Sequence, residues 1–261
     1  MGFFETASAT APRLGTWIKL ATTESVDIMA SAGFDFVVID LEHAPLDLTI
    51  TARMIATALA YGVDPLVRVP DQQATTIQRV LDAGAKGVLV PHVDSAAEAE
   101  RAVAATRFPP LGTRGAGGTS RAGRWGLLPR AEYIRTGNEE IVCIPQLESP
   151  AAIDAAAAIL AVPGVDAVFL GAGDLSLTLG VEMGDPVVRQ SLDRARAAAA
   201  AAGKPCGAAC VDGPSAVRAA GLGHQFLIMG NDATMLARTA HSMTRAFREQ
   251  LPAPPKAEAT P

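Results

Sequence analysis

The sequence predicts an α/β fold in which eight strand–helix units close into one (β/α)8 (TIM) barrel. Short apolar segments alternate with Ala-, Leu- and Arg-rich segments from end to end of the 261-residue chain. Most of the short segments are apolar at nearly every position, which is typical of parallel strands covered on both faces. Glycine recurs just before them, where a helix would end. Eight such units in about 250 residues are the number that closes a barrel.

Each expected strand is a short apolar run, and each expected helix is a longer segment of helix-forming residues. In chain order we expect strands at 16–20 (TWIKL), 35–40, 65–69 (PLVRV), 87–91 (GVLVP), 141–146 (IVCIPQ), 166–170 (DAVFL), 205–209 (PCGAA) and 225–229 (QFLIM). We expect helices at 47–61, 74–83, 95–106, 149–161, 187–202, 213–221 and 232–249. An open doubly wound sheet is the competing topology. The segment ATTESVDIM after the first strand has neither the G-x-G-x-x-G nor the P-loop pattern that such a sheet often carries there.

Composition limits the domain organisation and the class of partner. We expect one barrel domain over residues 1–250 and, from the composition PAPPKAEATP, a disordered tail over 251–261. A net charge of −5 without a basic cluster argues against nucleic acid. We expect no membrane partner and a cytoplasmic protein, because no apolar stretch could span a bilayer and no secretory signal is visible.

Charged and polar side chains follow the apolar runs, and the active sites of barrels lie at these carboxyl ends of the strands. The side chains there are Asp40, Glu42, His43, Arg68, His92, Gln146, Glu148 and Asp174. Some have a structural explanation as well, since Asp174 suits a helix N-cap and Glu148 the first turn of a helix. Arg68 within PLVRV is harder to explain in that way, because a charge inside an apolar strand needs a partner or lines a site.

The two acids that follow neighbouring strands, Glu148 and Asp174, predict a site for a hard divalent cation such as Mg²⁺ or Mn²⁺. Two protein ligands leave positions for a substrate that chelates through its carboxylate and 2-oxo oxygens. Arg68 would stabilise negative charge on the 2-oxo oxygen, and His43 would carry a proton. This set of groups suits a reaction that makes and uses an enolate.

The segment 107–130 is long for a connection in a compact domain, and such loops are usually functional. It contains five arginines and neither lysine nor acid: Arg107, Arg114, Arg121, Arg124 and Arg130. Any one of them could be an ordinary solvated side chain. As a group they suit carboxylate binding or a subunit interface, and Arg121 is our candidate for a substrate carboxylate.

The motifs IDLEHAP, VRV, LDAGAKGVLVP, TRGAGGTSRAGRWG, QLES and GAGDLS occur in that order. With them the chain resembles, over about residues 13–249, the metal-dependent class II pyruvate aldolases of the 4-hydroxy-2-oxoheptanedioate and 2-keto-3-deoxy sugar-acid type, in the aldolase/citrate lyase superfamily. The resemblance implies reversible cleavage of a 4-hydroxy-2-oxo acid to pyruvate and an aldehyde through a metal-bound enolate, with Mg²⁺, Mn²⁺ or Co²⁺. It also implies that the last helix packs on a neighbouring subunit, usually in a hexamer built as a trimer of dimers.

The same resemblance implies roles for individual residues. His43 would be the base, Arg68 the transition-state stabiliser, and Glu148 and Asp174 the metal ligands. Gln146, Gly173 and Asp174 would contact the pyruvate moiety.

A family acid that raises the basicity of the histidine is matched by Asp82. The expected helix 74–83 puts Asp82 at the opposite end of the barrel, so Asp40 is the alternative partner of His43. GAGD stands where the family commonly has Gly-Pro-Ala-Asp, and the pair Gly117-Gly118 is unusual. Substrate choice therefore cannot be transferred from the resemblance.

Three other functions remain open from the sequence. A Schiff-base aldolase would need a desolvated lysine, for which Lys19 in the first strand is the candidate. A lyase for malyl- or citramalyl-CoA-like thioesters and a non-catalytic metabolite-binding barrel are the other two. The apolar stripe of helix 232–249 fits packing on its own barrel and on a neighbour equally well.

Overall fold

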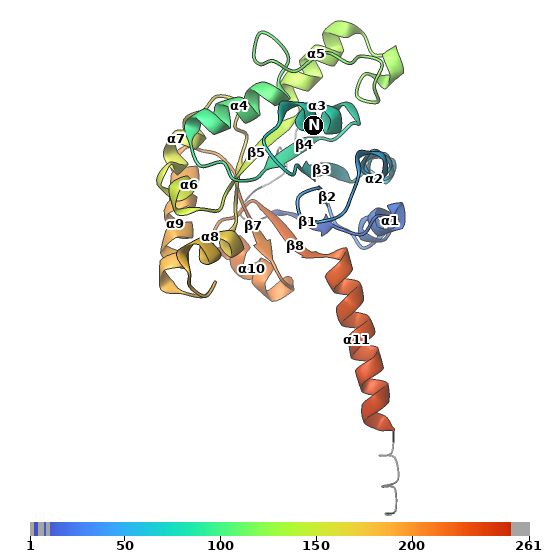
Figure 1. The fold of residues 1–261 in the computed structure, drawn as a ribbon, viewed down its shortest axis with the longest axis vertical. Helices are drawn as coiled ribbons and strands as arrows, with labels where there is room; N and C mark the ends of the chain where they lie inside the picture. The colour runs from blue at the N-terminus through green and yellow to red at the C-terminus, as the bar shows by residue number, and fades with distance from the viewer. Residues whose placement is uncertain (1–2, 5–7, 9–10, 252–261) are drawn as a thin grey trace, which may run out of the picture.

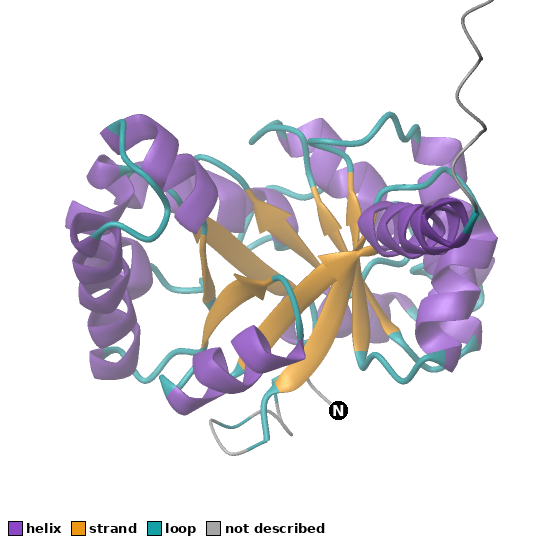
Figure 2. Ribbon diagram, turned by 90° about the horizontal axis from the view of Figure 1, so that it is seen from below, coloured by secondary structure: helices purple, strands orange, loops and turns teal. Residues whose placement is uncertain are grey.

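Eight parallel strands form a closed barrel in the computed structural model, which describes residues 3–4, 8 and 11–251 (Figures 1 and 2). The strands are β1 (Arg13–Ile18), β2 (Phe36–Asp40), β3 (Asp64–Arg68), β4 (Gly87–Val90), β5 (Val142–Leu147), β6 (Val168–Leu170), β7 (Cys206–Cys210) and β8 (Phe226–Asn231). Each strand pairs with the next, and β8 pairs with β1. The predicted barrel is confirmed, and every expected strand exists within a few residues of its expected bounds.

Except for α11, the helices surround this barrel on the outside (Figures 1 and 2). They are α1 (Thr23–Ser31), α2 (Leu48–Ala60), α3 (Ala74–Asp82), α4 (Ala96–Thr106), α5 (Arg130–Glu139), α6 (Pro150–Asp154), α7 (Ala156–Ala161), α8 (Ala172–Leu179), α9 (Pro186–Ala201), α10 (Gly213–Gly221) and α11 (Asp232–Gln250), with a 3₁₀ turn at Arg124–Gly126. The expected helix 149–161 is two helices that meet at Ala155, and α1, α5 and α8 were not among the expected helices. Two of these three, α5 and α8, contain glycine, which lowers helix propensity in a sequence pattern.

Apolar residues fill the barrel from within and between the strands and helices. Phe36, Leu66, Leu89, Ile144 and Phe226 belong to the interior cluster and are fully buried. A larger cluster of aliphatic residues lies between strands and helices. Within the described residues, this packed interior leaves no channel through the middle of the barrel, so a ligand can bind only at one of its two ends.

The last helix, α11, does not pack along its own barrel but extends away from it (Figure 1). Its apolar side chains Leu236, Met243 and Phe247 are 63%, 69% and 65% exposed. Packing of this stripe on its own barrel, which the sequence left open, is therefore wrong. The start of α11 is nevertheless anchored, because the buried carboxylate of Asp232 accepts hydrogen bonds from the backbone N–H groups of Lys19 and Leu20.

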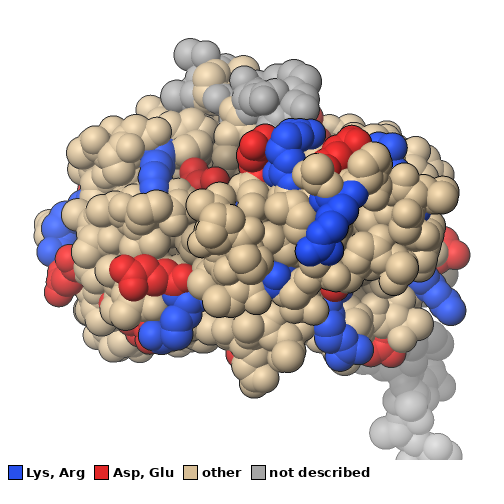
Figure 3. Space-filling view, turned by 90° about the horizontal axis from the view of Figure 1, so that it is seen from above, with Lys and Arg blue, Asp and Glu red and all other residues tan. Residues whose placement is uncertain are grey.

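Two sequence predictions concern the surface and the ends of the chain. Cations and anions are interspersed over the face that lies at the top of Figure 1, without a broad field of one sign (Figure 3). Within the described ranges, no helix combines the length and apolarity needed to cross a membrane. Apart from Leu251, the predicted disordered tail 251–261 lies outside the described residues.

Candidate active site

The carboxyl ends of the strands surround a cavity of about 650 Å³. Arg68 ends β3, Gln146 lies in β5, and Glu148 directly follows β5. Gly173 and Asp174 lie in the first turn of α8, which follows β6. These five predicted site residues line the same cavity because the parallel register of β5 and β6 brings their carboxyl ends together.

Arg68 is held by a buried carboxylate on the neighbouring strand. Its Nε and Nη2 donate to Asp40 Oδ1 and Oδ2 at 2.9 and 2.7 Å, and Lys19 also donates to Asp40 Oδ2. The Trp17 ring lies 4.3 Å from the guanidinium carbon. Burial by itself would raise the pKa of Asp40, but the hydrogen bonds and charges of Arg68 and Lys19 outweigh it and lower the pKa to about 2. Asp40 is therefore a permanent anion that fixes the orientation of Arg68.

Glu42 and His92 extend this ionic cluster towards β5. Arg68 Nη1 lies 3.0 Å from Glu42 Oε2, although this contact lacks the alignment of a hydrogen bond. The His92 ring lies between two acids, with Nε2 3.2 Å from Glu42 Oε1 and Nδ1 3.3 Å from Glu148 Oε1. The backbone N–H of His92 also donates to Glu148 Oε1 at 2.8 Å. Arg68 and Glu148 are thus linked through two intervening side chains.

Glu148 is a buried carboxylate with few compensating charges. Its pKa is raised, first by burial and further by the charges of Glu42 and Asp174, while the hydrogen bond and charge of His92 oppose the rise. A Cβ atom at Gly171 would lie 2.8 Å from Glu148 Oε2, so only glycine leaves room for this carboxylate. Glu148 precedes the N-cap Ser149 and Asp174 follows the N-cap Gly171, so neither acid has the purely structural position that the sequence also allowed.

The donor set fits a hard cation. Gln146 Nε2 donates to Glu148 Oε2 at 2.9 Å, while Gln146 Oε1 is buried and has no hydrogen-bond partner in the described chain. Carboxylate and amide oxygens are the ligands that Mg²⁺ and Mn²⁺ prefer. Among the described residues, no group of three or more His, Cys, Asp or Glu side chains is arranged to hold a metal. Any such cation would therefore rest on two carboxylates and on oxygens from the amide, substrate and water.

His43 lies at the rim of the site, and its side chain is 55% exposed. Asp40 Oδ1 accepts from the backbone N–H groups of Glu42 and His43 at 3.1 and 3.2 Å. Asp40 thus orients the loop that carries His43 through its backbone. The alternative prediction was that Asp40 orients the imidazole ring of His43. The ring nitrogen Nε2 lies 3.7 Å from Glu42 Oε2.

Asp82 and Arg121 are not brought to this site within the chain. Asp82 ends α3 at the amino end of the barrel, where it accepts from Arg114 Nη2 at 2.8 Å. Arg121 lies across Gly84 at the same end, with its Cδ 3.1 Å from the position of a Cβ there. Asp82 therefore lies at the end of the barrel that its place in the helix predicted. Neither Asp82 nor Arg121 lines the cavity of this chain that holds Arg68 and Glu148.

Some residues of the site had only weak signals in the sequence. Lys19 was considered only as a Schiff-base candidate, and its ion pair with Asp40 was not foreseen. Glu42 and His92 were recognised as strand-end residues without roles. The unusual backbone of His92, with a φ of 54°, was not predictable because only the tertiary contacts of Glu148 and Gln72 hold it. Trp17 of β1 stacks on Arg68. This contact was not predicted, because Trp17 lies in an apolar run and was interpreted only as part of a strand.

Comparisons with known proteins identify the family of the chain. Residues 13–245 match the model of the family described as HpcH/HpaI aldolase/citrate lyase. The chain belongs to the HpcH/HpaI aldolase/citrate lyase family. It is accordingly a lyase.

Individual members of the family are similar over most of their length. A 4-hydroxy-2-oxo-heptane-1,7-dioate aldolase of Salmonella paratyphi C is 37% identical over 248 residues, which are 94% of each chain. A hydroxypyruvate/pyruvate aldolase of Deinococcus radiodurans is 39% identical over 92% of this chain and 87% of its own. The crystal structure of an HpcH/HpaI aldolase from Desulfitobacterium hafniense superimposes with a TM-score of 0.87 and 32% identity, covering 94% of this chain and 95% of that one.

Proposed function

We propose that the protein is a divalent-metal-dependent aldolase that cleaves 4-hydroxy-2-oxo acids reversibly to pyruvate and an aldehyde. The observation that carries the proposal is the shared cavity of Arg68, Gln146, Glu148 and Asp174. The named relatives act as 4-hydroxy-2-oxo-heptane-1,7-dioate and hydroxypyruvate/pyruvate aldolases, which is the same reaction class. Mg²⁺, Mn²⁺ or Co²⁺ held by Glu148 and Asp174 would polarise the 2-oxo group of the substrate.

Arg68 supplies the charge for the transition state. Of the five N–H donors of a guanidinium, three face Asp40 and Glu42, so two remain for the substrate. As the C3–C4 bond breaks, negative charge builds on the 2-oxo oxygen, and a preorganised cation beside that oxygen lowers the barrier. Asp40 and Trp17 hold the guanidinium in place before the substrate arrives.

His43 is the proposed base. Its exposed ring lies beside Glu42, which in turn lies beside Arg68, and there it would take the proton of the 4-hydroxyl of a bound substrate directly or through water. Loss of that proton expels the aldehyde and leaves the enolate of pyruvate, which is then protonated at C3. The start of α8 offers free backbone N–H groups at Gly173 and Asp174 to the substrate carboxylate.

The rival mechanisms have less support. A Schiff base requires a neutral amine, but Lys19 is ion-paired with Asp40, and an ammonium group has no lone pair with which to attack a ketone. A CoA-thioester lyase of the malyl or citramalyl type would need a nucleotide surface beside the cavity. The arginine-rich loop that could have formed one lies at the other end of the barrel. A non-catalytic metabolite-binding barrel would not require an arginine held in one orientation, Arg68, beside the two acids Glu148 and Asp174.

We propose further that the protein is a homo-oligomer in which α11 packs on a neighbouring subunit, as in a hexamer made of three dimers. The support is the exposed stripe of Leu236, Met243 and Phe247 on a helix that leaves its own barrel. Since Asp82 and Arg121 cannot reach their own chain's cavity, a role for them in catalysis requires the cavity of a neighbour. A monomeric mass in solution would contradict this arrangement.

The direct test is a turnover assay on purified protein. A panel of 4-hydroxy-2-oxo acids is incubated with metal-stripped protein and then with Mg²⁺, Mn²⁺ or Co²⁺, and pyruvate is measured. We expect cleavage only after a metal is added. Undiminished turnover by stripped protein, together with borohydride trapping of a pyruvate adduct on Lys19, would replace this mechanism with the Schiff-base one.

The placement of Glu148 is tested separately by metal binding. Gly171→Ala puts a methyl group 2.5 Å from Glu148 Cβ, which displaces the carboxylate. Because disturbed ligand orientation typically costs 10- to 100-fold in metal affinity, we expect Mn²⁺ to bind at least tenfold more weakly by calorimetry. Gly184→Ala is the control, since nothing lies within 4 Å of its added Cβ. Equal Mn²⁺ affinity in both variants would contradict Glu148 as a ligand.

A further inference from the structure

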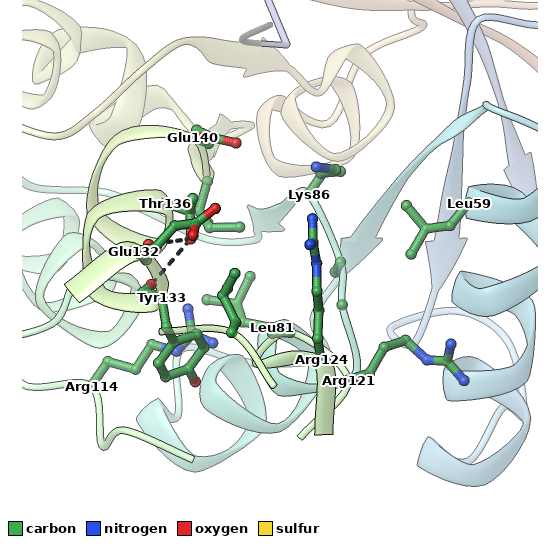
Figure 4. A pocket seen from close by; sticks show the side chains of 16 residues that line it. Leu59, Leu81, Lys86, Arg114, Arg121, Arg124, Glu132, Tyr133, Thr136 and Glu140 are labelled. Carbon is green, nitrogen blue, oxygen red and sulfur yellow. Dashed lines mark hydrogen bonds between the residues drawn. The ribbon is translucent and has the colours of Figure 1, made fainter. Parts of the chain in front are cut away.

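A second cavity lies at the amino end of the barrel, opposite the active site. It has a volume of about 260 Å³ and lies between the ends of α2 and α3, the arginine-rich loop and α5. We call it the loop pocket, and its lining includes Lys86, Arg121, Arg124, Tyr133 and Glu140 (Figure 4). Lys86 directly precedes β4, whereas His92, at the active site, follows the other end of that strand. The length of the barrel separates the two cavities.

The loop that forms one wall is fixed by its own backbone. The N–H of Ala122 donates to the carbonyl of Asp82 at 3.2 Å, and that of Trp125 donates to Ser120 at 2.9 Å. Gly123 packs so closely on Gly118 that a Cβ would lie 1.9 Å from the Gly118 carbonyl oxygen. This packing holds Arg124 at one place on the wall, and Figure 4 shows its guanidinium directed towards Lys86.

Three cations of the loop pocket have no ion-pair partner among the described residues. In the described part of the chain, Lys86, Arg121 and Arg124 form no salt bridge within 4 Å. Arg114 behind them is bonded to Asp82, but its buried Nε has no partner among the described residues. Two acids also line the pocket, Glu132 in α5 and its C-cap residue Glu140, and Glu140 pairs with Arg135 at 3.4 Å. Cationic groups directed towards one another are unfavourable unless an anion lies between them.

We propose that the loop pocket binds a small multivalent oxyanion, a phosphate or a dicarboxylate, between Lys86 and Arg124. The guanidinium fork of Arg124 suits two oxygens of one carboxylate or phosphate group, and the Lys86 ammonium adds a point charge. At about 30 Å³ for each water in the liquid, the volume holds roughly eight or nine waters, which is enough for such an anion and not for a nucleotide. The anion would join the loop, β4 and α5 at the end of the barrel remote from catalysis.

The test is calorimetric titration of the full-length protein with inorganic phosphate and, in a separate arm, with succinate. We expect saturable binding of at least one of them, weakened at least tenfold by Lys86→Met and by Arg124→Leu, and weakened by added salt. Arg101→Leu on α4 is the matched control, because its side chain is 63% exposed and does not line the pocket. The arm that binds identifies the anion as phosphate-like or dicarboxylate-like.

Two further measurements keep the result tied to this pocket. Glu148→Gln changes the active site only, so the anion should bind this variant as it binds the wild type. Arg124 is exposed, so its replacement should leave the melting temperature without the anion unchanged. Absence of saturable binding in both arms, or equal affinity in Lys86→Met, Arg124→Leu and the wild type, would overturn the proposal.

Discussion

Two arginine–aspartate pairs at opposite ends of the barrel have the same chemistry and different surroundings. Arg68 binds Asp40 through two parallel hydrogen bonds from strand to strand, under the ring of Trp17 and beside the large cavity. Arg114 binds Asp82 through one hydrogen bond from a loop to a helix end, with its guanidinium carbon 4.5 Å from the Phe108 ring.

The comparison indicates that the end of the barrel at which an arginine–aspartate pair lies decides the role of the pair. At the carboxyl ends of the strands, the neighbouring residues are further strand ends with polar groups and space for a ligand. At the amino end, the neighbours of Asp82 are a loop and Tyr133, whose hydroxyl lies 3.4 Å from Asp82 Oδ1. We therefore propose that the first pair serves chemistry, whereas the second holds the arginine-rich loop on α3.

The largest expected effect comes from Arg68→Ala. Removing an oxyanion-stabilising group typically costs about 3 kcal/mol of barrier, or roughly a hundredfold in rate. We expect kcat/KM for pyruvate release to fall by about that factor, with Arg101→Ala as the control at an exposed position. An Arg68→Ala enzyme that cleaves at the normal rate would end the comparison, because neither pair would then serve catalysis.

Arg114→Leu should act on stability. The change removes a guanidinium that is 1% exposed and leaves Asp82 without its ion-pair partner. Breaking a fully buried pair costs 3–5 kcal/mol, and Asp82 is 20% exposed, so we expect a loss of about 2 kcal/mol in the free energy of unfolding. Urea denaturation of this variant and of Arg101→Leu measures it. A loss no larger than that of the control would show that the loop is held by other contacts.

The smallest effect is the pH dependence of the Asp40 pair. Its pKa is lowered from 3.8 to about 2, which corresponds to roughly 2 kcal/mol of stability. For a lowered pKa this contribution is complete above about pH 4 and is lost as pH falls towards 2. We expect the difference in unfolding free energy between wild type and Asp40→Asn to shrink across that range. A difference that stays constant from pH 5 to 2.5 would contradict a charged Asp40 in the folded protein.

Much of the fold could be predicted because it depends on local patterns. Continuous apolar runs such as 36–40 mark strands covered on both faces, and Gly33, Gly62 and Gly84 end helices with φ between 73° and 103°. Three helices, α1, α5 and α8, were missed, and two of them have weak helix propensity. α5 and α8 contain glycine and form because their apolar residues, such as Tyr133 and Leu175, are buried against the rest of the protein.

The sequence by itself determined that strand ends would gather Asp40, Arg68, Gln146, Glu148 and Asp174 at one rim, because parallel strands of a closed barrel must share their direction. Only the tertiary structure decided which side chains each of them meets. The arginine-rich segment leads from α4 towards β5, so the order of the elements already places it at the amino end of the barrel. Its contact with Asp82, through the backbone N–H of Ala122, is seen only in the tertiary structure. The direction of α11 could not be predicted either. An apolar stripe indicates that one face of a helix is buried, but it does not indicate whether its own barrel or another subunit covers that face.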